Sequence, residues 1–205
     1  MYPRTTKSFL LLIVLLIVAI ALAGCDLGGS PTAPIADPRS PLPMGTPTPF
    51  AYNIRDDVQF IDTMVPHHQL AIDMARIAEN RYQHGEVLGL AHDIITDQED
   101  EIHRMLLWRA ELAGASPTPD PRTPMSNHDI MPGMDVDLAA LATSKDFDRD
   151  FINAMTQHHQ AAIDMSNAAV PNLKKREVRD LAHDIIIVQQ VEIDRMKRWL
   201  KDWYK

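Results

Sequence analysis

The sequence predicts an all-α domain, a four-helix bundle made of two repeated helix hairpins, and three observations support this. Residues 60–74 recur as residues 151–165, at an offset of 91. A second segment, residues 90–95, recurs as residues 181–186 at the same offset. No run of Val, Ile and Thr alternates with polar residues as a strand would. One offset shared by two motifs indicates that each repeat holds two helices with a fixed connection, so two repeats give four helices.

Local signals place the ends of these helices. Apolar periodicity predicts helices over residues 55–80, 85–113, 146–169 and 172–203. Asn53 or Asp56 is a suitable N-cap for the first helix, and Ser144 is one for the third. Gly85 is placed to mark the turn inside the first hairpin, and Gly114 is placed to end its second helix.

The N-terminus has the features of an export signal. Arg4 and Lys7 precede an almost unbroken apolar run over residues 8–23, which is followed by Gly24 and Cys25. This run is short for a membrane span, which needs about 20 residues. Small residues before a cysteine, directly after such a run, are typical of a bacterial lipobox. We therefore expect residues 1–24 to be removed, Cys25 to be lipidated, and the protein to lie outside the cytoplasm, in the cell envelope, anchored to a membrane.

The remaining chain divides by composition, and its charge limits its partners. We expect the lipidated cysteine and a Pro-rich tether over residues 25–54 and a four-helix domain over 55–205, made of a first repeat (55–113), a Met/His/Pro-rich linker (114–143) and a second repeat (144–205). The formal charge of −8 becomes −10 when Arg4 and Lys7 leave with the signal. Such a surface disfavours nucleic acid as a partner. Because Cys25 is the only cysteine, disulfides, Cys–zinc sites and thiol catalysis are excluded.

Histidine and methionine side chains point towards the predicted core. On a helical wheel, Met64 and His68 lie inside the apolar arc of the first helix, and His67 and Met74 lie at its edge. A buried imidazole without a partner costs roughly 1–3 kcal/mol, so a repeated arrangement of this kind suggests a purpose. Thioether and imidazole donors together suit copper, and Cu(I) in particular. The candidate metal ligands in the first helix of each repeat are Met64, His67, His68, Met74, Met155, His158, His159 and Met165.

Further candidates lie on the second helix of each hairpin and in the linker. His92 and His183 lie at the edge of the apolar arc, as ligands or as groups that support ligands. The auxiliary candidates in the linker are Met125, His128, Met131 and Met134. Two structural interpretations stay open: the methionines pack as core residues, and the His pairs form a hydrogen-bonded core network, with Gln98 and Gln189 as partners.

The repeated motif resembles a known family. The motif reads Met-Val-Pro-His-His-Gln-Leu-Ala-Ile-Asp-Met over residues 64–74, and its second copy and the Leu-Ala-His-Asp-Ile segments complete the pattern. Over residues 55–203 the chain is similar to domain-of-unknown-function family 305. The resemblance implies a ferritin-like helical bundle in an exported bacterial protein, and some members are linked to copper. It also implies that the eight His and Met positions are the family's own. Gln157 replaces Pro66 in the second copy, so the halves are not equivalent; Pro66 is expected to kink the first helix.

The favoured function is binding and not catalysis. We expect reversible coordination of copper, or silver, for buffering, transfer or resistance, with the membrane and other metal-handling proteins as partners. A first alternative is an envelope-stress or protein-interaction lipoprotein whose His pairs are structural. A second alternative is a di-iron oxidase of the ferritin-like type. It is disfavoured because the chain contains no Glu-x-x-His motif.

Overall fold

The structure is a computed structural model that describes residues 52–113 and 133–204. Every regular element in these ranges is a helix: α1 (Asp57–Arg81), α2 (Gly85–Ala113), α3 (Leu138–Thr143), α4 (Phe147–Ala169), the 3₁₀ turn η1 (Val170–Asn172) and α5 (Arg176–Trp203). The predicted all-α class is therefore confirmed. None of these described helices has both the length and the apolar character needed to cross a membrane. The expected signal, Cys25, Gly114, Met125, His128 and Met131 lie outside the described residues.

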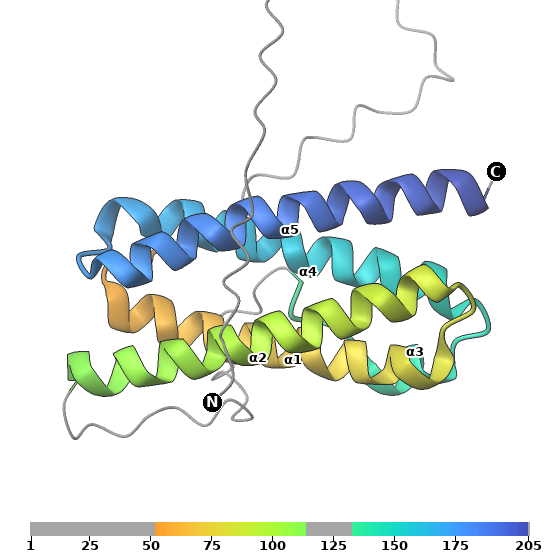
Figure 1. Ribbon diagram of the computed structural model, residues 1–205, viewed down its shortest axis with the longest axis horizontal. Coiled ribbons are helices and arrows are strands. Elements are labelled where there is room, and N and C mark those ends of the chain that lie inside the picture. The colour runs from red at the N-terminus through yellow and green to blue at the C-terminus, as the bar shows by residue number, and fades with distance from the viewer. Residues whose placement is uncertain (1–51, 114–132, 205) are drawn as a thin grey trace, which may run out of the picture. The chain divides into compact units, whose positions relative to one another are not determined.

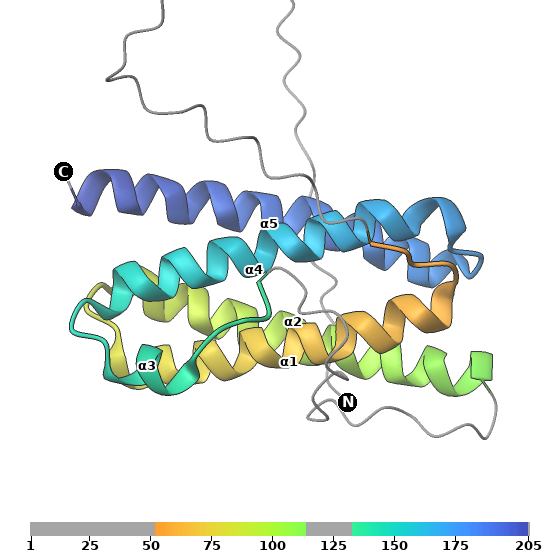
Figure 2. The same cartoon turned by 180° about the vertical axis from the view of Figure 1, so that it is seen from behind.

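Four long helices pack as two antiparallel hairpins. The first hairpin is α1 with α2, and the second is α4 with α5 (Figures 1 and 2). The main contact between the hairpins is α1 against α4, whereas α2 and α5 touch much less. The α1–α2 turn lies at one end of the bundle and the α4–α5 turn at the opposite end (Figure 1). The two hairpins are thus related by an approximate two-fold axis, and positions 91 residues apart are equivalent.

Two buried aspartates fix this arrangement by capping across the axis. Asp57, at the start of α1, accepts hydrogen bonds from the backbone N–H groups of Lys174 and Lys175 in the α4–α5 turn. Its equivalent Asp148, at the start of α4, accepts from the backbone N–H groups of Gln83 and His84 in the α1–α2 turn, at 2.9 and 2.7 Å. Each hairpin therefore supplies the acceptor for the turn of the other, which fixes the register of α1 against α4 at both ends.

The helix ends follow the sequence signals except at the starts of α4 and α5. Helix α5 begins at Arg176 and not at the predicted residue 172, because the 3₁₀ turn η1 precedes it. Asp56 is the N-cap of α1 and accepts from the backbone N–H of Gln59, as predicted. The N-cap of α4 is Asp146, so the prediction of Ser144 was wrong. The reason is the short helix α3, which lies inside the segment expected to be linker and uses Ser144 as its C-cap. Helix α1 continues unbroken through Pro66.

The crossed caps lead to a stability prediction. Asp148→Ala is expected to lower the free energy of unfolding by roughly 2–3 kcal/mol, because the backbone N–H groups of Gln83 and His84 and the ring Nδ1 of His84 lose a charged partner, and such bonds contribute about 1.5–3 kcal/mol. Chemical denaturation followed by circular dichroism measures the change. Asp180→Ala removes an exposed carboxylate from α5 and should stay within about 0.5 kcal/mol of the parent chain. Equal losses in the two variants would contradict the capping role.

Candidate metal centre

Two equivalent histidines meet where α1 packs against α4. The ring centroids of His67 and His158 lie 3.7 Å apart, and both side chains are buried. Nε2 of His158 donates a hydrogen bond to the backbone carbonyl of His67 at 2.9 Å. Neither ring nitrogen of His67, nor Nδ1 of His158, has a hydrogen-bond partner among the described residues. Because a neutral imidazole has one lone-pair nitrogen, His67 and His158 can each offer one nitrogen to a metal at the centre of the bundle.

The other two histidines are held by carboxylates. Nε2 of His68 lies 2.7 Å from Oε2 of Glu101, and Nε2 of His159 lies 2.8 Å from Oε2 of Glu192. Both rings are fully buried, and the exposed fractions of the two glutamate side chains are 13% and 6%. Each pair joins the two helices of one hairpin, and each carboxylate aligns the ring that it contacts.

Glu101 and Glu192 were not among the predicted site residues. Gln98 and Gln189 were the expected partners in a hydrogen-bonded network of the His pairs, but the carboxylates take that place. A signal was present, because Glu101 and Glu192 keep the offset of 91 and each follows its histidine by 33 residues. Gln98 and Gln189 are buried on the same helices, and their Oε1 atoms have no hydrogen-bond partner within the described ranges.

The four methionines of the motifs are fully buried in the core. Met64 packs in one hydrophobic cluster with Met165, and Met74 packs in the other with Met155. Each cluster therefore combines one methionine from each repeat, as expected when α1 and α4 run antiparallel. Soft thioether donors thus lie in the core on the two helices that carry the histidines, and they also fill the core as packing residues.

Other candidate ligands lie away from this centre. His92 is 58% exposed, and its Nε2 lies 3.5 Å from Oε1 of Glu79. His183 is also exposed, so the structure brings neither residue to the buried histidines. Met134 is partly buried and packs against the cluster that contains Met64. Within the described ranges, no three His, Cys, Asp or Glu side chains are gathered in a geometry that could hold a metal ion.

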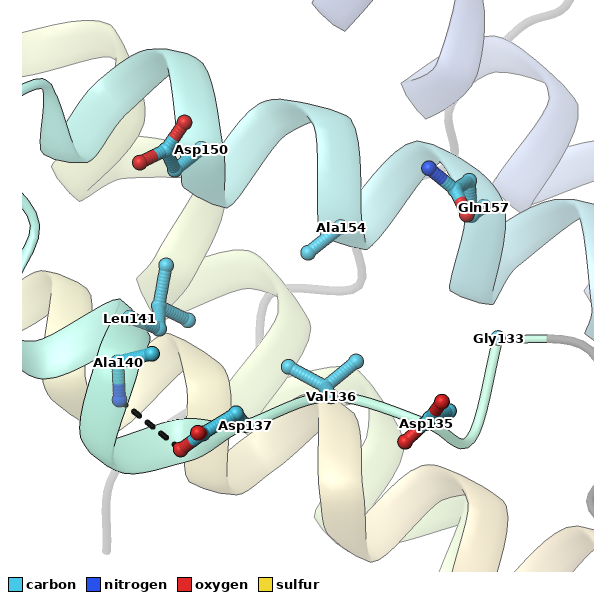
Figure 3. A pocket seen from close by; sticks show the side chains of 9 residues that line it. All are labelled: Gly133, Asp135, Val136, Asp137, Ala140, Leu141, Asp150, Ala154 and Gln157. Atoms are coloured by element: carbon cyan, nitrogen blue, oxygen red, sulfur yellow. Dashed lines mark hydrogen bonds between the residues drawn. The ribbon is translucent and has the colours of Figure 1, made fainter.

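The end of the linker is seated directly on α4 beside the His pair. Gly133 has a φ of +82°, and a Cβ there would lie 2.8 Å from Cα of His158, so only glycine fits. Beside it is a surface pocket of about 460 Å³ (Figure 3), lined by Gly133, Asp135, Val136, Asp137, Ala140, Leu141, Asp150, Ala154 and Gln157. Asp137 caps α3, and Asp150 accepts from the hydroxyl of Ser144. These two carboxylates are therefore occupied in structural contacts.

Burial keeps the central histidines neutral. It is the largest cause that lowers the pKa of His67 and of His158 well below the usual 6.5, and neighbouring histidines lower both further. The next cause is His158 for the ring of His67, and His159 for the ring of His158. Neutral imidazole is the form that binds metal ions. At neutral pH these rings are thus ready to act as ligands.

These lowered pKa values predict acid sensitivity. Below about pH 6.5 the unfolded chain binds protons on both rings, whereas the folded chain does not. The stability that the neutral, buried rings allow is therefore fully present above that pH. The free energy of unfolding then falls as the pH drops below it, by up to about 1.4 kcal/mol per pH unit for each ring. Denaturation at a series of pH values should give a shallower slope for His67→Gln/His158→Gln. The exposed pair His92→Gln/His183→Gln is the matched control, and an equal change in its slope would contradict the assignment.

Solved structures similar to this chain contain copper and silver. The Cu(II)-bound form of CopM is 41% identical, covers 74% of this chain and 99% of that chain, and has a TM-score of 0.66. The Cu(I)-bound form is 40% identical over 73% of this chain and 98% of that chain, with a TM-score of 0.64. Silver-bound forms of CopM are similar to the same degree.

Two further proteins and one family model match this chain. A DUF305 fragment from Deinococcus radiodurans is 30% identical, covers 71% of this chain and 95% of that chain, and has a TM-score of 0.62. An uncharacterized protein of Acanthamoeba polyphaga mimivirus is 42% identical over 50 residues, which are 24% of this chain and only 33% of that protein's length. The model of the family described as Domain of unknown function (DUF305) matches residues 57–200. Because this match spans most of the chain, the protein belongs to the DUF305 family.

Proposed function

We propose that this protein is an extracytoplasmic lipoprotein that binds copper or silver reversibly, for buffering, transfer or resistance. The observation that carries the proposal is the similarity to CopM, at about 40% identity over almost the whole of that chain, in copper-bound and silver-bound forms. The donors in the core agree with this, since imidazole and thioether groups suit soft metal ions.

The central histidines and the nearby methionines are the best ligands for such an ion. His67 has two ring nitrogens without a hydrogen-bond partner among the described residues, and His158 has one. Met64 and Met155 lie one helical turn before them, on the same face of each helix. His68 and His159 are less available because a carboxylate already holds each ring. The central histidines therefore have one of these methionines in each of the two core clusters, and imidazole with thioether suits Cu(I) or Ag(I).

Binding at this centre requires movement, because every one of these donors is buried. A metal ion has to enter through a local opening of the bundle. Gly133 and Met134 lie against α4 and the core, so the Met/His-rich linker ends next to the donors. We propose that Met125, His128 and Met131 receive the ion first and pass it inward. The protein then acts by coordination and not by catalytic turnover.

The proposal includes a location at a membrane surface. The apolar run before Cys25 motivates lipidation of that residue, and the seven prolines of residues 26–50 motivate the proposal of a stiff tether. The anchored domain would exchange metal with other metal-handling proteins of the envelope. Labelling with a radioactive or alkynyl fatty acid, in the parent chain and in Cys25→Ser, tests the anchor. A label that persists in Cys25→Ser would exclude this site.

A titration tests the metal proposal. The full chain, purified in detergent and stripped of metal, should bind Ag(I) and Cu(I) stoichiometrically. Met64→Leu/Met155→Leu should weaken this binding at least about tenfold, which corresponds to about 1.4 kcal/mol, because two soft donors are lost. Leucine for methionine conserves core volume, so the fold should be retained.

The matched control is Met105→Leu/Met196→Leu, which changes two other equivalent and fully buried methionines, on α2 and α5. It should bind silver and copper as the parent chain does. If the parent chain binds neither ion, the proposal is wrong, and a protein-interaction lipoprotein with structural histidines becomes the better interpretation.

A further inference from the structure

A small cavity lies between α2 and α5, where these two helices make only limited contact. Its volume is about 10 Å³, enough for roughly one water molecule or one ion. It is lined by Ile94, Asp97, Gln98, Glu101, Ile185, Val188, Gln189 and Glu192. These are four pairs of equivalent positions, 91 residues apart, so the cavity lies on the approximate two-fold axis. Gln98 and Glu101 are three residues apart and share one face of α2, as Gln189 and Glu192 do on α5.

The polar groups that line the cavity are carboxylates and primary amides, and Ile94, Ile185 and Val188 form the rest of its wall. Three carboxylates line it, those of Asp97, Glu101 and Glu192, and no lysine or arginine does. Gln98 and Gln189 are each 3% exposed, and their Oε1 atoms have no hydrogen-bond partner in the described part of the chain. A buried acceptor without a partner is unfavourable, and so is the proximity of the carboxylates of Glu101 and Glu192, which are 13% and 6% exposed and have a histidine but no lysine or arginine as a partner among the described residues. A cation in the cavity would relieve both costs at once.

We propose that this cavity is a site for a hard divalent cation, held by the carboxylates of Glu101 and Glu192 and the amide oxygens of Gln98 and Gln189. Carboxylate and carbonyl oxygens are the donors that Mg²⁺ and Mn²⁺ prefer. The amide oxygens are needed, because no three acidic or imidazole side chains among the described residues form a ligand set by themselves. The site is distinct in chemistry from the thioether and imidazole centre at the crossing of α1 and α4.

The buried histidines orient the carboxylate ligands of this site. His68 holds Oε2 of Glu101 at 2.7 Å, and His159 holds Oε2 of Glu192 at 2.8 Å. Carboxylates that bind metal ions are commonly aligned by hydrogen bonds of this kind. Each glutamate thereby keeps its other oxygen, Oε1, for the cation.

A solvent pocket of about 530 Å³ gives access to the site. It is lined by Thr96, Asp97, Asp100, Glu101, Arg104, Asp184 and Val188. Asp97, Glu101 and Val188 line both the pocket and the cavity, so the two are adjacent. Most of the charges in the pocket are acidic, which attracts cations towards it.

The test is a titration of the metal-free full chain with Mn(II), followed by electron paramagnetic resonance, in which bound Mn(II) is distinguished from the free ion. The parent chain should bind one Mn(II). Glu101→Gln/Glu192→Gln should weaken binding at least about tenfold. The control Asp73→Asn/Asp164→Asn also removes two negative charges, at equivalent positions that line neither the pocket nor the cavity. It should bind Mn(II) as the parent chain does.

A second variant decides the matter if the glutamate variant does not fold. Gln98→Leu/Gln189→Leu keeps both carboxylates and approximately the core volume, removes the two amide oxygens and adds no thioether, so it should fold and bind Mn(II) several-fold more weakly. Absence of stoichiometric Mn(II) binding by the parent chain would overturn the proposal, as would unchanged binding in both variants or an equal loss in the aspartate control. Ag(I) binding by the same variants reports separately on the thioether centre and should be unchanged.

Discussion

The packing of α1 against α4, centred on the rings of His67 and His158, is the contact on which the rest of the domain depends. It is the main contact between the hairpins, and it brings both repeats of the motif together. Asp57 and Asp148 then lock its two ends by capping the turns of the opposite hairpin. With α1 and α4 fixed in this way, α2 and α5 meet only loosely, and the polar cavity lies between them.

The core contains buried polar and charged groups in places where apolar side chains could pack. Imidazole and carboxylate pairs such as His159 with Glu192 are fully or almost fully buried, where apolar residues of similar volume would often stabilise the fold as well or better. The chain has this arrangement twice, and the two histidines His67 and His158 form a third buried pair on the axis. We propose that metal binding accounts for these buried polar groups, which packing alone does not explain. The centre of α1 and α4 offers soft donors, and the seam of α2 and α5 offers oxygen donors, so the two halves of one core suit different ions.

The two repeats have diverged around a shared frame. Arg109 holds Asp62 through two hydrogen bonds between α1 and α2, whereas the equivalent positions in the second hairpin are Leu200 and Asn153. The lining of the cavity between α2 and α5 differs as well, because Asp97 on α2 is matched by Val188 on α5. The crossed caps, the four buried histidines and the two glutamates are retained in both halves. What both halves keep is thus the frame and the donor groups.

The sequence alone determined the four long helices, the pairing into repeats and the inward direction of Met64 and His68, because helical period and a fixed offset are local properties of the chain. Met64 and His68 are fully buried as predicted, but His67 and Met74, which were placed at the edge of the apolar arc, are buried as well because α4 packs against α1. The sequence did not reveal Glu101 as the partner of His68, the capping of one hairpin by the other, or α3. It also could not decide that His92 and His183 face solvent. A helical wheel gives the direction of a side chain about the axis of its own helix. Only the packing of several helices decides which side chains of the other helices it contacts.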